Sequence, residues 1–385
     1  MITSLDLFAG AGGLTLGLKQ AGIHSIGAVE LDRFAALTFK HNFPNIPLTQ
    51  GDIHSISDSA MKLAYSGVDI IVGGPPCQGF SVAGPSQYGI IDSRNELIFE
   101  MYRAAKVLKP RMCIVENVKG ILHGKVSPSQ HALDTYMKLM KEIGYTIKIF
   151  VLQTANYGVP QGRERVFIIS AKDPRWIPES IPGKFGEGKV PWRNTWECLS
   201  DLPTVLSGEG TDARVDYDKP ATTAYQKLMR KNSDGVYNHV AMKHTTRLIE
   251  RFKHIPQGGS LVDAPAEYGQ RLRGGQDIDV HPRFKMNNQR LDPNNVSKAI
   301  TASFQSTFVH PFLDRNLTAR EGARIQSFPD SFVFCGPRTL MSKSLLLREG
   351  REDEIGLSQY NQIGNAVPPL MAEAIGKQVR LILKR

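Results

Sequence analysis

The first 170 residues alternate short apolar runs with amphipathic stretches. The apolar runs predict strands at 2–6, 25–30, 69–73, 111–116, 145–152 and 165–170. Apolar residues at helical spacing predict helices at 13–21, 32–41, 93–108 and 129–143. Strands that alternate with helices favour a parallel sheet covered by helices, because a parallel crossover needs a helix-length connection. We therefore expect an α/β domain at the start of the chain.

The pattern changes near Asp173, where Pro and Gly become frequent and turn signals are dense. Apolar residues at helical spacing return over 366–385, which predicts a helix that packs back on the first domain. We therefore expect a first domain of residues 1–185, completed by 357–385, and a second, smaller domain of residues 186–356.

Composition narrows the classes of protein to consider. The chain has 385 residues, and its 47 Lys and Arg against 37 Asp and Glu give a formal charge of +10, which favours a polyanionic partner without establishing one. The four cysteines form no CxxC pair, so neither a zinc site nor a disulfide framework is indicated. No signal peptide or membrane-spanning stretch is evident. We expect a cytoplasmic monomer without a metal or a membrane partner.

A glycine-rich turn follows the first predicted strand, in the segment DLFAGAGGL from Asp6 to Leu14. The glycine turn, which includes Ala11 and Gly13, lies between a strand and the N-terminus of a helix. In such a turn the backbone can approach a ligand closely and donate hydrogen bonds to it from its N–H groups. The dinucleotide fingerprint GxGxxG would need glycine where Thr15 stands, which disfavours a nicotinamide cofactor. The turn still predicts a nucleotide-like ligand.

Acidic residues follow the next two strands. Glu30 ends the second strand, where a carboxylate can accept hydrogen bonds from both ribose hydroxyls. Asp52 follows a third strand and could accept a hydrogen bond from an adenine amino group, with Ile53 packed on the ring. A single acid in such a place is more often a helix cap. Recurrence at successive strand ends favours the ligand-binding interpretation.

Three further motifs lie next to predicted strands. The segment GGPPCQGFS places Cys77 on a rigid Pro-Pro turn, whereas an average lone cysteine is a small buried hydrophobic residue. Glu116 begins an ENV segment at the end of another strand. Arg163 and Arg165 belong to QGRER, which precedes the strand VFII, and a structural ion pair is the alternative reading for at least one of them.

These motifs, in this order, resemble the bacterial DNA cytosine-5 methyltransferases of restriction-modification systems, over nearly the whole chain outside the middle of the second region. The motifs that carry the resemblance are FAGAGG (8–13), GGPPCQGFS (73–81), ENV (116–118), QGRERVFII (161–169), LTAREGARIQSFPD (317–330) and QIGNAVPP (362–369). The resemblance implies a Rossmann-like methyltransferase sheet that uses S-adenosylmethionine, with a second, smaller target-recognition domain.

The resemblance also implies a reaction. The thiolate of Cys77 adds to carbon 6 of cytosine, which makes carbon 5 nucleophilic enough to accept a methyl group. Glu116 handles a proton at ring nitrogen 3, while Arg165 and, less directly, Arg163 orient the base and support the loop that carries the cysteine. The base must be flipped out of the duplex, as the general behaviour of methyltransferases requires, and residues 82–94 are expected to close over it.

The cofactor implied is S-adenosylmethionine, with S-adenosylhomocysteine as the product. By resemblance, Phe8 and Leu31 contact the adenosine, and Pro76 and Leu97 line the pocket. The methionine side is expected to be closed by Asn365, Ala366 and Val367.

The partner implied is double-stranded DNA, with a restriction endonuclease as a genetic but not a physical partner. The sequence reader is expected within 210–285. Side chains that could contact base edges in the major groove are Arg271, Arg273, Gln276 and Lys285. Side chains expected to face phosphates are Lys243, Arg247 and Arg251.

Three other functions share features with this sequence. A tRNA cytosine-5 methyltransferase would share the catalytic core, but the PPCQGFS motif and the sizeable second region disfavour it. An inactive binding protein is disfavoured because Cys77, Glu116 and QGRER are all intact. A nicotinamide dehydrogenase fails at Thr15 and leaves the PPC and ENV motifs unexplained.

Overall fold

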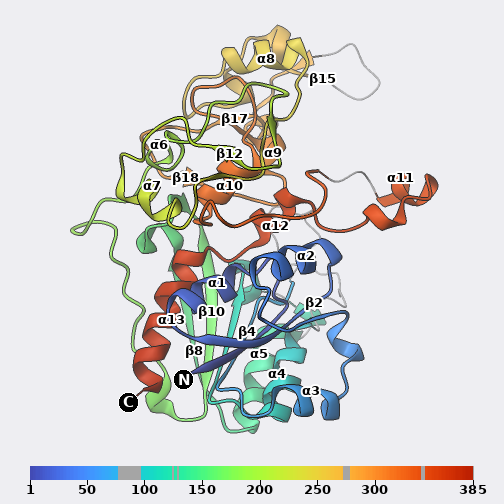
Figure 1. Cartoon of the computed structure of the whole chain (residues 1–385), viewed down its shortest axis with the longest axis vertical. Coiled ribbons are helices and arrows are strands. Elements are labelled where there is room, and N and C mark those ends of the chain that lie inside the picture. The colour runs from blue at the N-terminus through green and yellow to red at the C-terminus, as the bar shows by residue number, and fades with distance from the viewer. Residues whose placement is uncertain (77–96, 124, 128–129, 272–277, 340–342, 385) are drawn as a thin grey trace. The chain divides into compact units, whose positions relative to one another are not determined.

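The computed structural model describes residues 1–76, 97–123, 125–127, 130–271, 278–339 and 343–384 (Figure 1). The chain forms two compact units. The first comprises Met1–Tyr157, Arg163–Lys189 and Ala366–Arg385, and the second comprises Gly158–Gly162 and Val190–Asn365. The boundaries therefore differ from those expected, because residues 357–365 belong to the second unit.

A seven-stranded sheet in the order β3-β2-β1-β4-β5-β10-β8 forms the centre of the first unit. Its strands are β1 (Thr3–Leu7), β2 (His24–Glu30), β3 (Leu48–Gln50), β4 (Ile70–Gly73), β5 (Met112–Asn117), β8 (Thr146–Gln153) and β10 (Glu164–Ala171). The first five strands pair in parallel, but β10 runs antiparallel to both of its neighbours. The sheet is thus mostly parallel, and the sequence did not predict the antiparallel direction of β10. A short connection without a crossover helix joins β8 to β10, and such connections produce antiparallel pairs.

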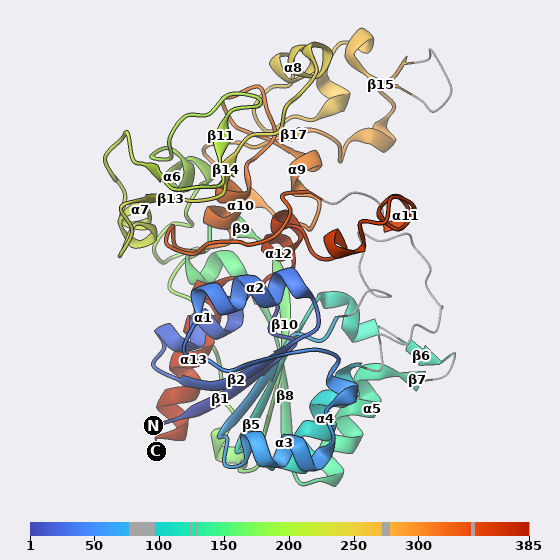
Figure 2. The ribbon, with the colours of Figure 1, turned by 45° about the vertical axis from the view of Figure 1, so that its right-hand side comes forward.

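Helices cover both faces of this sheet. Helices α1 (Gly13–Gln20) and α13 (Pro369–Leu383) lie on one face, and α3 (Asp58–Tyr65), α4 (Leu97–Leu108) and α5 (Ala132–Glu142) lie on the other, as Figure 2 shows. The unit also contains α2 (Arg33–Asn42), β6 (Lys125–Ser127) and β7 (Gln130–His131). The expected α/β class is confirmed, and the C-terminal helix returns to the first unit as predicted. Helix α3 was absent from the sequence prediction.

A glycine permits the close approach of α1 to α13. A Cβ atom on Gly17 would lie 2.4 Å from both the Cβ of Ala372 and the carbonyl oxygen of Pro369. Helices pack at such short separation only where one of them lacks a side chain. The apolar positions Leu14 and Leu18 of α1 then share a core with Met371 of α13.

The second unit consists of short elements, and its strands form two-stranded pairs. The helices are α6 (Thr195–Leu199), α7 (Ala224–Met229), α8 (Thr246–Lys253), α9 (Phe304–Thr307), α10 (Ala319–Ile325), α11 (Lys343–Arg348) and α12 (Gln359–Asn365). The strand pairs are β11 (Gly210–Thr211) with β14 (His239–Val240), β12 (Val215–Asp216) with β13 (Gly235–Val236), β15 (Gln270–Arg271) with β16 (Ile278–Asp279), β17 (Gln289–Arg290) with β19 (Phe308–Val309), and β18 (Ser297–Lys298) with β9 (Gln161–Gly162). No helix in the described part of the chain is long and apolar enough to cross a membrane.

Buried ion pairs organise the interior of the second unit. Arg324 donates to both carboxylate oxygens of Asp330 at 2.5 and 2.6 Å, and to Asp201 at 3.0 Å. Arg315 makes a bidentate pair with Glu321, at 2.8 and 2.7 Å. All five side chains are buried, and a buried charge is tolerated only when it is paired and hydrogen-bonded. The segment LTAREGARIQSFPD therefore supplies structural ion pairs to this unit.

A buried histidine in this unit predicts acid sensitivity. The Nδ1 atom of His310 accepts hydrogen bonds from the backbone N–H groups of Phe312 and Leu313, at 3.1 and 3.0 Å. Burial lowers the pKa of His310 to about 3. The pKa of a histidine in the unfolded chain is about 6.5. Below that value the unfolded state binds a proton that the folded state does not, so stability is lost as the pH falls from about 6.5 towards 3.

We therefore expect the free energy of unfolding to fall by about 2 kcal/mol from pH 7 to pH 5 on account of His310. The replacement His310→Asn keeps an acceptor near Nδ1 and should flatten this dependence. Thermal melts followed by circular dichroism at several pH values would measure it. The control His24→Asn, at an exposed position of β2, should keep the parent slope. Equal slopes for parent and His310→Asn would contradict the prediction.

Candidate active site

The carboxyl ends of β1 to β5 meet at one edge of the sheet in the first unit, because these five strands are parallel. Most of the residues singled out from the sequence follow these strands directly. They are the turn from Phe8 to Gly13 after β1, Glu30 and Leu31 at the end of β2, Asp52 after β3, the stem Gly74 to Pro76 after β4, and Glu116 in β5. The edge is therefore the candidate active site.

The turn after β1 depends on left-handed backbone. Phe8, Gly10 and Gly12 have φ angles of 61°, 55° and 95°, a region that a side chain other than glycine adopts rarely. A Cβ atom on Gly12 would lie 2.4 Å from the ring of Phe43. Ala11 and Gly13 are buried in the same turn. The turn is consequently tight enough for a ligand to approach the backbone.

Glu30 connects this turn to the end of β2. Its Oε2 atom accepts a hydrogen bond from the Gly10 N–H, and its Oε1 atom accepts one from the Asp32 N–H, both at 2.7 Å. Burial raises the pKa of Glu30. Each carboxylate oxygen can accept a second hydrogen bond. The neighbouring Leu31 is 69% exposed, so an apolar surface lies beside the carboxylate.

The turn after β3 presents Asp52. Its carboxylate, which is 55% exposed, accepts a hydrogen bond from the His54 N–H at 3.0 Å and lies 2.9 Å from His54 Nδ1. These hydrogen bonds lower the pKa of Asp52. Ile53 is only 3% exposed and belongs to the core beneath the sheet. The side chain of Ile53 anchors the turn and leaves little surface for a ligand.

The stem after β4 passes close to Glu116. A Cβ atom on Gly73 would lie 2.4 Å from the carbonyl oxygen of Leu7, and one on Gly74 would lie 3.1 Å from Glu116 Oε2. Asn117 Nδ2 donates a hydrogen bond to the Pro75 carbonyl at 3.0 Å. Cys77 and the segment 82–94 lie outside the described residues. The stem that leads to the cysteine is thus held against β5.

Glu116 forms a buried ion pair with Arg165 of β10. Arg165 Nε lies 2.8 Å from Glu116 Oε1, although its N–H is not directed well enough to count as a hydrogen bond. Both side chains are buried. Burial raises the pKa of Glu116 and the ion pair only partly opposes this, while burial lowers the pKa of Arg165. The carboxyl group is therefore closer to its protonated form than an exposed glutamate would be.

Arg163 occupies a different environment. Its backbone N–H donates to Gln153 Oε1 at 2.7 Å and to Thr154 Oγ1 at 3.1 Å, which fixes the chain at the end of β8. Its side chain is half-buried. Of the two arginines in QGRER, the structure therefore places Arg165 against Glu116.

The other residues expected around the cofactor vary in exposure. Pro76 is exposed, and Leu97 is half-buried at the first position of α4. Asn365 is the exposed last residue of α12 in the second unit. Ala366 is half-buried in the first unit, and Val367 is buried in its core.

The structure corrects one of the expected DNA contacts. Arg251 of α8 is only 6% exposed, and its guanidinium donates to the carbonyls of Tyr268 and Gly269, at 2.5 and 2.7 Å, and to Asn288 Oδ1 at 2.9 Å. The expectation that Arg251 faces phosphate groups is wrong, because its donors are used on the protein's own backbone. Arg247 likewise donates to the Gly269 carbonyl, at 2.9 Å.

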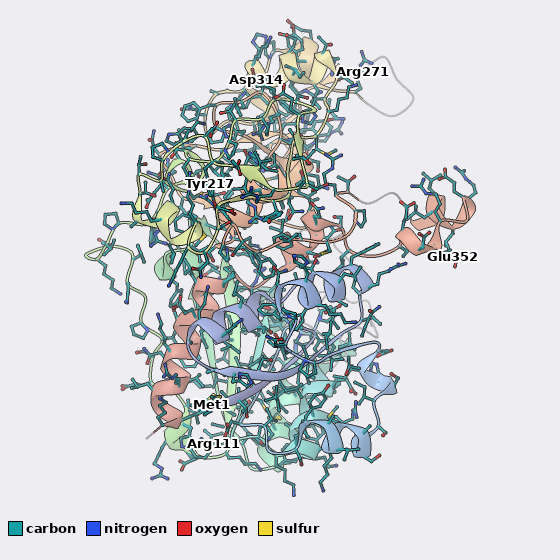
Figure 3. All side chains as sticks on the ribbon, viewed as in Figure 1. Met1, Arg111, Tyr217, Arg271, Asp314 and Glu352 are labelled. Atoms are coloured by element: carbon teal, nitrogen blue, oxygen red, sulfur yellow. The ribbon has the colours of Figure 1, made fainter. Side chains whose placement is uncertain are left out.

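The exposed basic residues Lys243, Arg271 and Lys285 remain candidates for DNA contact, and Figure 3 labels Arg271. Arg273 and Gln276 lie outside the described residues. No group of three or more His, Cys, Asp or Glu within the described ranges is arranged to hold a metal ion.

Sequence reasoning missed two polar residues at the same edge. Asp6 is buried, accepts a hydrogen bond from Thr15 Oγ1 at 2.5 Å, and keeps Oδ1 without a partner among the described residues. Burial raises its pKa to about 7. Asn117, which donates a hydrogen bond to the Pro75 carbonyl, was not singled out within the ENV motif. A charged residue inside an apolar strand was the available signal for Asp6.

A mostly parallel sheet of this kind is the fold of the DNA methyltransferases. A solved structure described as a prophage-encoded DNA modification methyltransferase of E. coli aligns over the whole of both chains, with a TM-score of 0.75 and 25% identity. Residues 2–380 match the family model of the C-5 cytosine-specific DNA methylases, and the chain belongs to that family.

Relatives of this chain carry the name Type II methyltransferase. The chain is 43% identical to the Type II methyltransferase M.DdeI of Desulfomicrobium norvegicum, over 97% of this chain and 88% of the relative. It is 30% identical to M1.HphI of Haemophilus parahaemolyticus, over 98% of this chain and 86% of the relative. The protein is therefore a DNA cytosine-5 methyltransferase, and a tRNA substrate is less supported.

Proposed function

We propose that this enzyme methylates carbon 5 of a flipped cytosine within a specific double-stranded DNA sequence, with S-adenosylmethionine as the methyl donor and Cys77 as the nucleophile. The observation that carries the proposal is the position of Glu116. This buried acid has a raised pKa, is paired with Arg165, and lies beside the glycine stem that leads to Cys77.

The residues at the sheet edge fit S-adenosylmethionine. Glu30 has one acceptor position on each oxygen beyond the two backbone hydrogen bonds, which suits the two ribose hydroxyls. Leu31 and Phe8 offer apolar contacts to the adenosine, and Asp52 can accept a hydrogen bond from the adenine amino group. Within the first unit, the pocket is completed by Ala11, Gly13, Pro76, Leu97, Ala366 and Val367. When bound, the cofactor supplies an electrophilic methyl group.

The protein's part in the chemistry begins at Cys77. Its thiolate forms a bond to carbon 6 of cytosine, and the electron pair of the 5,6 double bond becomes available at carbon 5. Glu116, whose pKa is raised by burial, donates a proton to ring nitrogen 3 and neutralises the charge that addition creates. Carbon 5 then accepts the methyl group, and S-adenosylhomocysteine is left as the product. A base removes the proton from carbon 5, the bond from carbon 6 to sulfur breaks to release the Cys77 thiolate, and ring nitrogen 3 returns its proton to Glu116.

Arg165 acts next to this acid. Its Nε atom lies 2.8 Å from the Glu116 carboxyl and its Nη1 atom donates to the Glu164 carbonyl at 3.0 Å, so Nη2 is the donor proposed for the cytosine carbonyl oxygen. Arg163 is the second candidate for that carbonyl. Both arginines are proposed to orient the cytosine, because a base held in position is attacked far faster than a mobile one.

The second unit is the proposed target-recognition domain. Arg271 and Lys285 are exposed there and can reach base edges or phosphates, while Lys243 adds positive charge. We further propose that the enzyme acts as a monomer. A separately encoded restriction endonuclease of the same specificity is the proposed genetic partner, without a physical association.

A methyl-transfer assay tests the proposal. With tritium-labelled S-adenosylmethionine, we expect label in duplex DNA that contains the recognition sequence and none in tRNA. Methylome sequencing of a methylation-free host that expresses the protein should show 5-methylcytosine at one recurring sequence. Label in tRNA with none in DNA would overturn the proposal.

A further inference from the structure

The guanidinium of Arg103 in α4 reaches across to the turn that presents Asp52. Its Nη2 atom donates to the Ile53 carbonyl at 2.9 Å, and its Nη1 atom donates to the Ile56 carbonyl at 2.9 Å. Nη1 also donates to Asp58 Oδ1 at 2.7 Å. The Arg103 side chain is 24% exposed, and its bonds to the two carbonyls are partly shielded from water, whereas its bond to Asp58 is exposed. One side chain thus binds both ends of the turn.

A second connection runs through Glu100. Arg103 Nε donates to Glu100 Oε2 at 2.8 Å, which holds the guanidinium in place on its own helix. The other oxygen of Glu100 lies 3.9 Å from His54 Nε2, and His54 Nδ1 lies 2.9 Å from Asp52 Oδ1. Glu100 and His54 therefore lie between Arg103 and Asp52, but only the His54–Asp52 and Arg103–Glu100 contacts are of hydrogen-bond length, so the backbone carbonyls form the direct link from Arg103 to the turn.

The turn is short, and its own support consists of the buried Ile53 side chain and of the Ser55 and Ile56 N–H groups, which donate to the Asp52 and Ile53 carbonyls at 3.0 and 3.1 Å. It comprises a single 3-10 helix of three residues, η1 (Ile53–Ser55), between the short strand β3 and helix α3. Short 3-10 segments have poor hydrogen-bond geometry, so carbonyl partners from a neighbouring helix weigh heavily in their conformation. A planar guanidinium can serve two carbonyls and a carboxylate at once, whereas a lysine ammonium is a point charge on a flexible stem.

We propose that Arg103 is a positioning residue for cofactor binding, which sets the turn so that Asp52 meets the adenine amino group. This inference rests on the proposed role of Asp52. Helix α4 also begins with Leu97, so the same guanidinium sets the adenine turn relative to the helix that lines the pocket. Arg103 contacts neither the cofactor nor the base and acts only through the turn.

The preference of the protein for a ligand that carries the adenine amino group can be measured as a ratio of two affinities. A general loss of stability would not change this ratio. S-inosylhomocysteine differs from S-adenosylhomocysteine in carrying a carbonyl oxygen in place of that amino group. Isothermal titration of both compounds into the full chain yields their affinity ratio. We expect the parent to prefer the adenosyl compound by at least about tenfold, as sites built around a hydrogen bond do. Arg103→Met should lower this ratio by about tenfold, mainly by weakening the adenosyl compound.

Four further variants make the outcome decisive. Arg103→Lys should restore the ratio only in part, and it serves as the folded variant if Arg103→Met is unstable. Asp52→Ala should abolish the preference, and Arg103→Met added to it should change the ratio no further. Arg111→Met is the matched control. Arg111 is also partly exposed and donates to the Leu383 carbonyl at 2.9 Å, but it precedes β5 at the opposite edge of the sheet, near Met1 (Figure 3).

The two assignments fail in different ways. If Asp52→Ala keeps the parental preference, the adenine assignment of the proposed function is wrong. If Asp52→Ala removes the preference while folded Arg103→Met or Arg103→Lys retains it in full, the positioning role of Arg103 is overturned. The same conclusion follows if Arg111→Met lowers the ratio as much as Arg103→Met.

Discussion

Replacement of Cys77 with alanine is expected to abolish methyl transfer while S-adenosylhomocysteine binding stays within about twofold of the parent. The thiolate has no substitute in the proposed path, because carbon 5 of cytosine does not attack a methyl donor unless a nucleophile has first added to carbon 6. The thiol acts on the base, so the cofactor site at the ends of β1 to β3 should be unaffected. Methyl-transfer assays and isothermal titration would measure the two properties.

Cys335→Ala is the matched control, since Cys335 lies in the second unit and takes no part in the proposed reaction. It should retain the parent rate. Substantial turnover by Cys77→Ala would show that another residue, or no residue, is the nucleophile.

A duplex whose target cytosine carries fluorine at carbon 5 extends this test. Addition of Cys77 and methyl transfer can proceed, but the final elimination must remove a proton from carbon 5, and fluorine cannot leave as a cation. A covalent complex should therefore survive denaturing electrophoresis, with DNA attached to the peptide that contains Cys77. Normal turnover on ordinary cytosine without any adduct on the fluorinated duplex would refute covalent catalysis.

The second large effect is expected for Glu116→Gln, which should slow single-turnover methyl transfer by ~10²–10⁴-fold. Glutamine keeps the shape of the side chain but cannot give a proton to ring nitrogen 3. S-adenosylhomocysteine affinity should change little. An unchanged transfer rate in a folded variant would remove Glu116 from the mechanism.

Stability has to be separated from catalysis in this experiment. Glu116→Gln leaves Arg165 as a buried charge without its partner, and breaking a buried pair from one side costs about 3–5 kcal/mol. The double variant Glu116→Gln with Arg165→Met removes that charge and should recover much of the lost thermal stability. It should not recover the rate, because the proton donor is still missing.

The candidate site could be predicted from the sequence wherever it depends on strand ends. Glu30, Asp52 and Glu116 were assigned to one edge because parallel strands bring their carboxyl ends together, and the structure places them there. The glycine turn was also legible, since left-handed backbone at Gly10 and Gly12 requires glycine. Both are short-range properties of the chain.

The sequence did not predict the pairing of Arg165 with Glu116. It depends on β10 entering the sheet antiparallel, between β5 and β8, with Phe167 opposite Glu116. In that register Arg165 is a diagonal neighbour of Glu116 on the same face. The apolar pattern of the strand is the same for either direction, so the pattern predicted the strand but not its orientation.

The sequence also did not predict which basic residues of the second unit are buried. Arg247 and Arg251 look like a charged helix face in the sequence, yet Arg251 is buried and binds the carbonyls of Tyr268 and Gly269. Arg320 and Arg324 in LTAREGARIQSFPD are also buried. Charge alone does not reveal whether an arginine meets solvent, DNA or the protein's own carbonyl groups.

The sequence by itself thus determined the α/β class, the family, and the acids and glycines at the strand ends, because hydrophobic period and turn chemistry act over a few residues. The tertiary structure alone decided the direction of β10, the Glu116–Arg165 pair and the contacts of Arg103 with Ile53 and Ile56. Each of those contacts joins residues that are 47 or more positions apart, and their geometry exists only when packing of the whole unit brings them together.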